Sequence, residues 1–334
     1  MQNIINGLPI AAVILLLAVG FAFLVKGADF FVEGSSSIAK KLKVPPIIIG
    51  LTIVAMGTSL PETAVSVTAS LVQNNELAVS NVVGSNIFNL MFVIGVCSIL
   101  TPIMVQKATV VRDIPLSLVC ALLLLVLGIS GLGDKAGMTL GHADGIIFLI
   151  VFAGYIFTMV RSAMKARAAG QKVEIEGVEE CDNMKELSYG KSILFLIVGA
   201  AAIAFGGDLT VDTASRIAIE LGMSQTLVGL TIVSIGTSLP ELVTSVVAAR
   251  KNEVDMAVGN AVGSNIFNIL MVLGISSAIS PVALIRENLI DIVLLMVFSV
   301  MVWIFAGTRK KIERKEGIIM VVVYLVYCAY IIAR

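Results

Sequence analysis

The sequence predicts an all-α polytopic membrane protein, with about ten transmembrane helices arranged as two inverted five-helix repeats. The first supporting observation is composition: 58% of the 334 residues are hydrophobic and 14% are charged, against about 25% charged residues in an average soluble domain. The second is the recurrence of apolar segments near the roughly 20 residues that a membrane-spanning helix needs. The third is that the polar motifs of the first half return in the second half.

Ten apolar segments account for most of the chain and leave little room for a separate soluble domain. They lie near residues 8–28, 45–70, 77–100, 110–128, 144–161, 192–212, 225–249, 255–279, 287–306 and 316–332. The first segment is not expected to be a signal peptide, because it has no basic start. In addition, Lys26 and Asp29 follow it where small residues would mark a cleavage site.

The two halves of the chain are copies of one unit. A shift of 179 residues places GLTIVAMGTSLPE at 50–62 on GLTIVSIGTSLPE at 229–241, with 11 of 13 residues identical, and GSNIFN at 84–89 on GSNIFN at 263–268. Each unit contains about five spans. Because five is odd, the second copy must enter the membrane from the opposite side. Inverted repeats are typical of secondary transporters, although channels and membrane enzymes can also be duplicated.

The repeat divides the chain into a first five-helix repeat at 1–161, a linker at 162–191 and a second five-helix repeat at 192–334. The linker contains VEIEGVEECDNMKEL, the only long polar segment, and is expected to be a solvated cytoplasmic connection. A regulatory calcium sensor is the alternative. The linker is short for a domain, at about 30 residues against 50 or more, and it lacks the D-x-D-x-D-G pattern of a calcium loop.

Lysine and arginine are unevenly distributed between the loops, and this predicts the orientation in the membrane. If the N-terminus faces outside, most of the 23 basic residues fall in loops on the inside, above all at 40–43, 161–191 and 309–315. We therefore expect both termini to be extracytoplasmic.

The cysteines and the histidine are not expected to form a metal site. The four cysteines, Cys97, Cys120, Cys181 and Cys328, are widely spaced and include no CxxC pair, so isolated thiols are expected. The single His142 lies in a predicted loop, GMTLGHAD, and is expected to be solvated. One histidine also excludes a histidine-rich metal centre.

The motif GTSLPE occurs at 57–62 and again at 236–241, within segments long enough to cross the membrane. Proline has no backbone N–H, and its ring clashes with the carbonyl one turn earlier. Pro61 and Pro240 are therefore expected to break their helices and release backbone carbonyls. An unpaired carbonyl is costly in hydrocarbon, so each break has to face protein, water or an ion.

A glutamate ends each motif. A charged side chain at the middle of the membrane costs about 2.5–3.5 kcal/mol on insertion scales, so Glu62 and Glu241 indicate a functional site. Thr58, Glu62 and Ser66 follow each other at four-residue spacing and share one helix face. Their counterparts in the second half are Thr237, Glu241 and Ser245.

The motif GSNIFN adds neutral oxygens from the next helices. Ser85 and Asn89 share a helix face, as do Ser264 and Asn268. Taken singly, such side chains more often form interhelical hydrogen bonds, but here their pairing with the glutamate motif is duplicated. Hard oxygen ligands without Cys or His suit calcium or sodium, and fit zinc or copper poorly. Two carboxylates balance one divalent or two monovalent cations, which favours an exchanger.

Duplicated GTSLPE followed by GSNIFN resembles the sodium/calcium exchangers of the calcium/cation antiporter superfamily, especially the short prokaryotic members, over nearly the whole chain. The resemblance implies ten helices in a prokaryotic cell membrane, with four central helices around a cluster of ion sites. It implies that Glu62 and Glu241 bridge the calcium and sodium sites. The other implied ligands are Thr58, Thr237, Ser59, Ser238, Ser85, Ser264, Asn89 and Asn268, with backbone carbonyls from Ala55 and Ser234.

The resemblance also concerns the first and sixth helices, which are long in this family and slide during alternating access. The pairs Asp29/Glu33 and Asp208/Asp212 are placed near the ends of these helices, where interfacial polar groups are expected. The chain departs from some archaeal and potassium-dependent relatives at Asn268, where they have aspartate. Asparagine removes a third titratable group and weakens the case for potassium co-transport.

The sequence therefore predicts a secondary antiporter, not an enzyme, that exchanges sodium for calcium by alternating access. No cofactor, nucleic acid or obligate protein partner is implied, so the partners are the transported ions and the lipid bilayer. A calcium/proton or other cation/proton antiporter with a similar site is the main alternative. A cation channel would conduct without a counter-ion. A membrane enzyme would use Glu62 and Glu241 as an acid/base pair, but the chain has no nucleophile motif or cofactor fingerprint.

Overall fold

The computed structural model describes residues 5, 7–71, 76–130, 138–168, 187–223, 232 and 234–333. These residues confirm an all-α polytopic membrane protein. Eight of their helices are long and apolar enough to cross a membrane, and the bent pair Pro46–Thr58 and Leu60–Thr68 brings the number to nine. The predicted segment at 225–249 lies partly outside the described residues. Most of the linker, including Cys181, also lies outside them.

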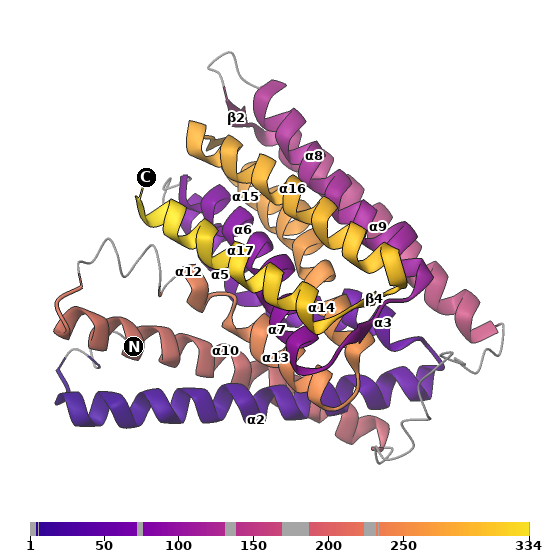
Figure 1. Cartoon of the computed structure of the whole chain (residues 1–334), viewed down its shortest axis with the longest axis horizontal. Coiled ribbons are helices and arrows are strands. Elements are labelled where there is room, and N and C mark those ends of the chain that lie inside the picture. The colour runs from indigo at the N-terminus through magenta and orange to yellow at the C-terminus, as the bar shows by residue number, and fades with distance from the viewer. Residues whose placement is uncertain are drawn as a thin grey trace.

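Two long helices, α2 (Ile10–Leu42) and α10 (Tyr189–Glu220), lie side by side along one edge of the molecule (Figure 1). Glycines allow this close approach, because a side chain at these positions would collide with the backbone of the other helix. Gly20 and Gly27 of α2 face Gly206 and Gly199 of α10, respectively.

Both long helices extend well beyond the predicted apolar segments 8–28 and 192–212. Asp29 and Asp208 therefore lie in the interior of α2 and α10, and the expectation that these acidic residues sit near helix ends is wrong. The predicted segments end near the first charged residues, because the hydropathy of the sequence falls there. Helix α2 continues for more than three further turns, because the chain contains no proline between Pro9 and Pro45.

The second span is broken as predicted. Helix α3 (Pro46–Ile49), the π-helical turn η1 (Gly50–Val54) and α4 (Ala55–Thr58) form its first part. After Ser59 the chain bends by 44° and continues as α5 (Leu60–Leu71).

The second half repeats this break. Helix α12 (Ser234–Gly236) ends shortly before α13 (Leu239–Arg250), which carries Pro240 in its first turn. Each proline occupies the start of the new helix, where the missing N–H leaves no intrahelical hydrogen bond unmade.

The core of the molecule is formed by two spans that contain the GSNIFN motifs. The first comprises α6 (Glu76–Ile87), the π-helical η2 (Phe88–Val93) and α7 (Ile94–Leu100). The second comprises α14 (Val254–Phe267), the π-helical η5 (Asn268–Val272) and α15 (Leu273–Ile279). In both spans 78% of the most apolar window is buried, against 39% or less in the other candidate spans.

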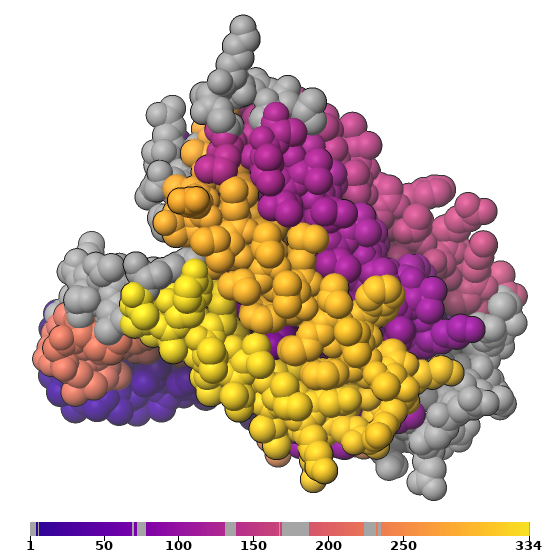
Figure 2. All heavy atoms as spheres, turned by 45° about the horizontal axis from the view of Figure 1, so that its top comes forward, coloured from indigo at the N-terminus to yellow at the C-terminus, as the bar shows by residue number. Residues whose placement is uncertain are grey.

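The remaining helices surround this core, and α16 and α17 cover much of the face in Figure 2. Their bounds are η3 (Thr109–Asp113), α8 (Ile114–Ser130), α9 (His142–Ala168), α16 (Arg286–Arg309) and α17 (Arg314–Ala333). His142 is exposed, but it begins α9 and its Nδ1 lies 2.9 Å from the carbonyl oxygen of Ala278, so its placement in a loop is wrong.

In the described part of the chain, four two-residue strands pair the two halves near the helix ends. Strand β1 (Ile103–Met104) pairs antiparallel with β4 (Lys311–Ile312), with Ile103 opposite Ile312. Strand β2 (Thr139–Leu140) pairs antiparallel with β3 (Val282–Ala283), with Leu140 opposite Val282. Each pair therefore joins a strand of the first half to one of the second half.

Contacts between the two halves are reciprocal. Strand β3 corresponds to β1 in the repeat, and each of them pairs with a strand of the other half. In the same way Gly145 of α9 packs against Gly274 of α15, while Gly317 of α17 packs against Gly95 of α7. A two-fold relation produces this pattern. It agrees with the predicted inverted repeats, whose orientation in the membrane and domain boundaries stay predictions.

Candidate functional site

The two glutamates of the repeated motif lie at the interface of the halves, and neither is exposed to solvent. Ser59 Oγ donates a hydrogen bond of 3.2 Å to Glu241 Oε1, and Ser238 Oγ donates one of 3.4 Å to Glu62 Oε1. Each carboxylate therefore accepts a hydrogen bond from the serine at the helix break of the other half. We call Ser59 and Ser238 the hinge serines.

The helix break explains why each carboxylate lies where it does. Glu62 falls in the first turn of α5 and Glu241 in the first turn of α13. Negative charge is stabilised at a helix N-terminus, where backbone N–H groups lack intrahelical partners. Because the break at Ser59 and Ser238 starts a new helix inside the molecule, it creates this environment at the interface of the halves.

Threonine–asparagine bridges form a second reciprocal pair of contacts. Thr58 Oγ1 lies 3.0 Å from Asn260 Oδ1, and Thr237 Oγ1 lies 3.3 Å from Asn81 Oδ1. Each asparagine also donates to a serine of its own half. These bonds join Asn81 Nδ2 to Ser66 Oγ at 3.3 Å and Asn260 Nδ2 to Ser245 Oγ at 2.9 Å. Both asparagines were absent from the predicted ligands, although they correspond in the repeat.

A cluster of four buried amides joins the two GSNIFN motifs. Asn86 Nδ2 donates to the backbone carbonyl of Asn265, and Asn265 Nδ2 donates to that of Asn86, both at 3.1 Å. Asn89 Nδ2 donates to Asn265 Oδ1 at 3.3 Å, and Asn268 Nδ2 donates to Asn86 Oδ1 at 3.2 Å. The sequence analysis selected Asn89 and Asn268 but missed Asn86 and Asn265, whose only signal was their place in the duplicated motif.

Five buried oxygens of the predicted ligands have no hydrogen-bond partner. They are Glu62 Oε2, Glu241 Oε2, Ser85 Oγ, Asn89 Oδ1 and Asn268 Oδ1. An unsatisfied buried polar group costs about 1–3 kcal/mol, and a charged one more. A bound cation would satisfy such acceptors, and carboxylate, amide and hydroxyl oxygens are the ligands of calcium and sodium.

The other predicted ligands lie around the same interface. Thr58 Oγ1 approaches Ser264 Oγ at 3.5 Å, which connects the helix break to the second GSNIFN motif. The carbonyl oxygen of Ala55 accepts from the backbone N–H of Ser59 at 3.0 Å. Ser234 begins α12, and its side chain is outside the description.

Neutral oxygens dominate the set of available ligands. Within the described part of the chain, no group of three or more His, Cys, Asp or Glu side chains could hold a metal ion. A cation bound at the interface would therefore depend on two carboxylates together with amide, hydroxyl and carbonyl oxygens.

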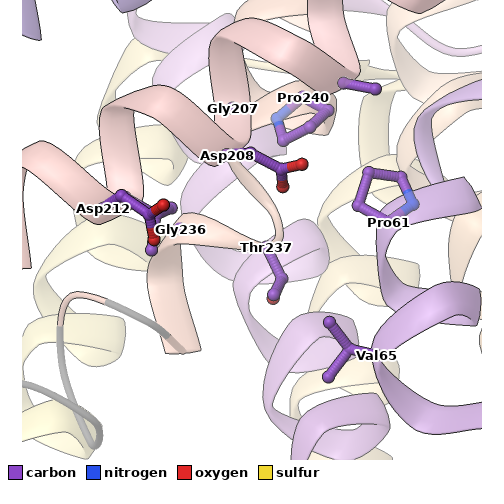
Figure 3. Close-up of a pocket in the computed structure, with 10 residues that line it drawn as sticks. Pro61, Val65, Gly207, Asp208, Asp212, Gly236, Thr237 and Pro240 are labelled. Atoms are coloured by element: carbon purple, nitrogen blue, oxygen red, sulfur yellow. The ribbon is translucent and has the colours of Figure 1, made fainter. Parts of the chain in front are cut away.

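A cavity of about 310 Å³ lies between α10 and the two broken spans. It is lined by Pro61, Val65, Ala204, Gly207, Asp208, Val211, Asp212, Gly236, Thr237 and Pro240. Figure 3 shows the carboxyl group of Asp208 extending from α10 toward the space between Pro61 and Pro240. Because Thr237 lines the cavity and also contacts Asn81, the cavity leads to the buried network.

At the corresponding position in the other half the helices are in contact. There α13 packs along α2. Lys251, at the end of α13, forms an ion pair of 3.3 Å with Asp29, the counterpart of Asp208 in the repeat. The interface is thus approached by a cavity between α10 and the broken spans, while α2 and α13 are in contact.

Comparisons with known proteins agree with this geometry. A family model described as sodium/calcium exchanger protein matches residues 12–161 and 191–333. The chain is 34% identical over 337 residues to the sodium/calcium exchanger MaX1 of Methanosarcina acetivorans, covering 94% of this chain and 96% of the relative. It is 35% identical over 296 residues to the inner membrane protein YrbG of Escherichia coli, covering 86% and 88%.

Solved structures give the same result. The fold is similar to that of the sodium-calcium exchanger NCX_Mj, with a TM-score of 0.80 and 31% sequence identity, covering 96% of this chain and 99% of that one. A similarity this extensive concerns the whole membrane fold and both copies of the repeated motif. The chain therefore belongs to the sodium/calcium exchanger family, whose members are secondary transporters and not enzymes.

Proposed function

We propose that the protein is an antiporter that exchanges sodium for calcium across the cell membrane by alternating access. The observation that carries this proposal is the reciprocal arrangement of Glu62 and Glu241. Each carboxylate keeps one oxygen without a partner while a serine of the other half binds its second oxygen. The two free oxygens belong to opposite halves, so one cation between them would be held by both repeats.

Charge balance gives the exchange its physical basis. Two ionised glutamates in a buried site are neutralised by one calcium ion or by two sodium ions. An unneutralised charge within the membrane is costly, so the occupied site is expected to be electrically balanced with either cargo. Because both cations use the same oxygens, binding of one displaces the other.

The proposed ligand set adds neutral oxygens to the two carboxylates. Amide oxygens come from Asn89 and Asn268, whose Oδ1 atoms are buried without partners. Hydroxyl and carbonyl oxygens complete the set, from Thr58, Thr237, Ser59, Ser238, Ser85, Ser264, Ala55 and Ser234. Calcium takes six to eight oxygens, so this set exceeds the need of one ion and suits several overlapping sites.

Alternating access would follow from movement of α2 and α10 as one unit. Their glycine contacts join them closely, while a cavity separates α10 from the broken spans and α2 packs against α13. Rocking of one bundle against the other around a central site is the usual mechanism of inverted-repeat transporters. The distribution of basic residues predicts that both termini lie outside. In that orientation α10 runs from inside to outside, and the cavity lies along its outer half, at 204–212.

Calcium-45 uptake tests the proposal directly. Purified protein is reconstituted into liposomes loaded with sodium or with choline, and external calcium-45 is added. Uptake that requires internal sodium is the expected result. Uptake that does not depend on internal sodium but is driven by an imposed pH gradient would overturn sodium coupling. It would favour a calcium/proton antiporter with the same site.

A further inference from the structure

The orientation of the four amides in the GSNIFN cluster follows from two backbone carbonyls. Asn86 and Asn265 each direct Nδ2 at the carbonyl oxygen of the other residue, both at 3.1 Å. A carbonyl oxygen can only accept a hydrogen bond. The nitrogen of each side chain must therefore face the carbonyl, which removes the usual ambiguity between the nitrogen and oxygen of an amide.

This fixed orientation determines that of the next two amides. Asn86 Oδ1 faces Asn268 at 3.2 Å, and Asn265 Oδ1 faces Asn89 at 3.3 Å. An amide oxygen is only an acceptor, so Asn268 and Asn89 must turn their NH₂ groups toward it. Their own Oδ1 atoms then point elsewhere, and these two oxygens are buried without a partner.

We propose that Asn86 and Asn265 are positioning residues that turn the amide oxygens of Asn268 and Asn89 toward the transported cation. The proposal rests on the proposed function, because it assigns those two oxygens to a bound cation. All four side chains have no exposure to solvent, so water does not compete for their donors. Neither Asn86 nor Asn265 needs to touch the ion for this role.

The same geometry sets a chemical requirement at positions 89 and 268. Whatever occupies them must donate a hydrogen bond to the oxygen of Asn265 or Asn86. Asparagine meets this requirement without charge. With asparagine at both positions, the number of carboxylates in the proposed site is two, which matches one divalent or two monovalent cations.

A double-mutant cycle between Asn86 and Asn268 tests the positioning role. Asn86→Ala, Asn268→Ala and the double variant are reconstituted, and the half-saturating calcium concentration of uptake is measured for each. Loss of a residue that orients a ligand typically weakens metal binding by about 10–100-fold. We expect Asn86→Ala to raise the half-saturating concentration by at least about tenfold, and the double variant to match Asn268→Ala alone.

Asn288→Ala provides the matched control. Asn288 is a buried amide that donates to Ser80 Oγ at 2.9 Å and accepts from the backbone N–H of Ile285 at 3.1 Å. Its loss removes two hydrogen bonds outside the cluster, so its effect and that of Asn268→Ala should multiply. An unchanged half-saturating concentration in Asn86→Ala, or effects that multiply with those of Asn268→Ala, would overturn the positioning role.

Two further measurements keep the test decisive. If Asn86→Ala does not fold, Asn86→Ser replaces it, and the corresponding cycle between Asn265 and Asn89 should give the same non-additivity. The rise in unfolding temperature on addition of calcium to purified protein measures binding without sodium. If the effects of Asn86→Ala and Asn268→Ala on this calcium-induced rise are additive, the positioning role is refuted. Absence of sodium-driven uptake in the unmodified protein refutes only the proposed coupling.

Discussion

Lys251 forms an ion pair with Asp29 that joins the end of α13 to the interior of α2. Its Nζ lies 3.3 Å from Asp29 Oδ1 and donates to the backbone carbonyl of Asp29 at 3.1 Å. The repeat has no second copy of this contact, because Val72 stands at the position that corresponds to Lys251. Asp208, which corresponds to Asp29, lines the open cavity instead.

A second charged residue of the same turn also faces α2. Glu253 precedes α14 and is nearly buried. Burial raises the pKa of Glu253, while Ser36 and Lys40 of α2 act in the opposite direction. This turn therefore places two charged residues, Lys251 and Glu253, next to α2.

Removal of the ion pair is expected to weaken closure of this face. Lys251→Met keeps the length of the side chain and loses the charge. A partly exposed ion pair contributes roughly 0.5–1 kcal/mol. The ratio between the conformation with α2 and α13 in contact and the cavity open, and the alternative with the cavity closed, should therefore fall about two- to fivefold. Labelling of Val65→Cys, a residue that lines the cavity, by a membrane-impermeant thiol reagent should slow accordingly.

Lys26→Met is the control for this experiment. Lys26 lies 3.8 Å from the same aspartate, but it belongs to α2 and joins no second helix. Its loss should leave labelling of the cavity unchanged. Equal labelling in Lys251→Met and the parent protein would show that the ion pair does not hold the face closed.

Replacement of either central glutamate is expected to abolish exchange. Glu62→Gln and Glu241→Gln retain shape and hydrogen-bonding capacity but leave a divalent cation with one compensating charge. An uncompensated buried charge costs about 3–5 kcal/mol, so sodium-dependent calcium-45 uptake should fall at least ~100-fold. Glu287→Gln, on an exposed part of α16, should retain normal uptake. Near-normal transport by either site variant would exclude the carboxylate pair as the cation ligand.

The sequence predicted the spans well, because hydropathy reports which segments avoid water. It predicted the ends of α2 and α10 poorly, since Asp29 and Asp208 interrupt the hydropathy without interrupting the helix. Side chains packed against a cavity or a neighbouring helix can be charged, and only the assembled structure shows which neighbour each residue has. The breaks at Pro61 and Pro240 were predictable because proline acts locally.

The candidate site was partly predictable for a similar reason. Glu62 and Glu241 stand out against apolar surroundings, and duplication marked them twice. Asn86 and Asn265 are as polar as Asn89 and Asn268, so composition does not distinguish a ligand from its support. The distinction lies in hydrogen bonds that cross from one half to the other over 176–182 positions of sequence.

The hinge serines Ser59 and Ser238 are expected to contribute equally to calcium binding, because their contacts are reciprocal. Ser59→Ala removes a hydrogen bond to Glu241, and Ser238→Ala removes one to Glu62. A hydrogen bond to a charged group is worth about 1.5–3 kcal/mol, so each variant should raise the half-saturating calcium concentration about tenfold or more. Ser299→Ala, which loses a buried bond to the carbonyl of Leu295, should not. A large effect in only one of the two hinge variants would contradict functional equivalence of the halves.

The glycine contacts between α2 and α10 predict a localised sensitivity to side-chain volume. Gly27→Leu would place its Cβ 2.9 Å from the backbone nitrogen of Ile203. Overpacking of this kind costs about 1–3 kcal/mol, so the unfolding temperature in detergent should fall. Gly154→Leu is the matched control, because a Cβ there meets no atom within 4 Å. Equal unfolding temperatures for the two variants would show that the α2–α10 contact adds no stability.

Aspartate at position 268 should make transport depend on pH. In Asn268→Asp the new carboxyl group must be protonated to donate a hydrogen bond to Asn86 Oδ1. Ionisation would break this bond and add a third negative charge to the site of Glu62 and Glu241. Calcium uptake should therefore be highest at low pH and fall as pH rises, relative to the unmodified protein. Asn89→Asp should behave alike, since Asn265 Oδ1 requires a donor in the same way. A pH profile identical to that of the unmodified protein in both variants would show that neither position needs a donor.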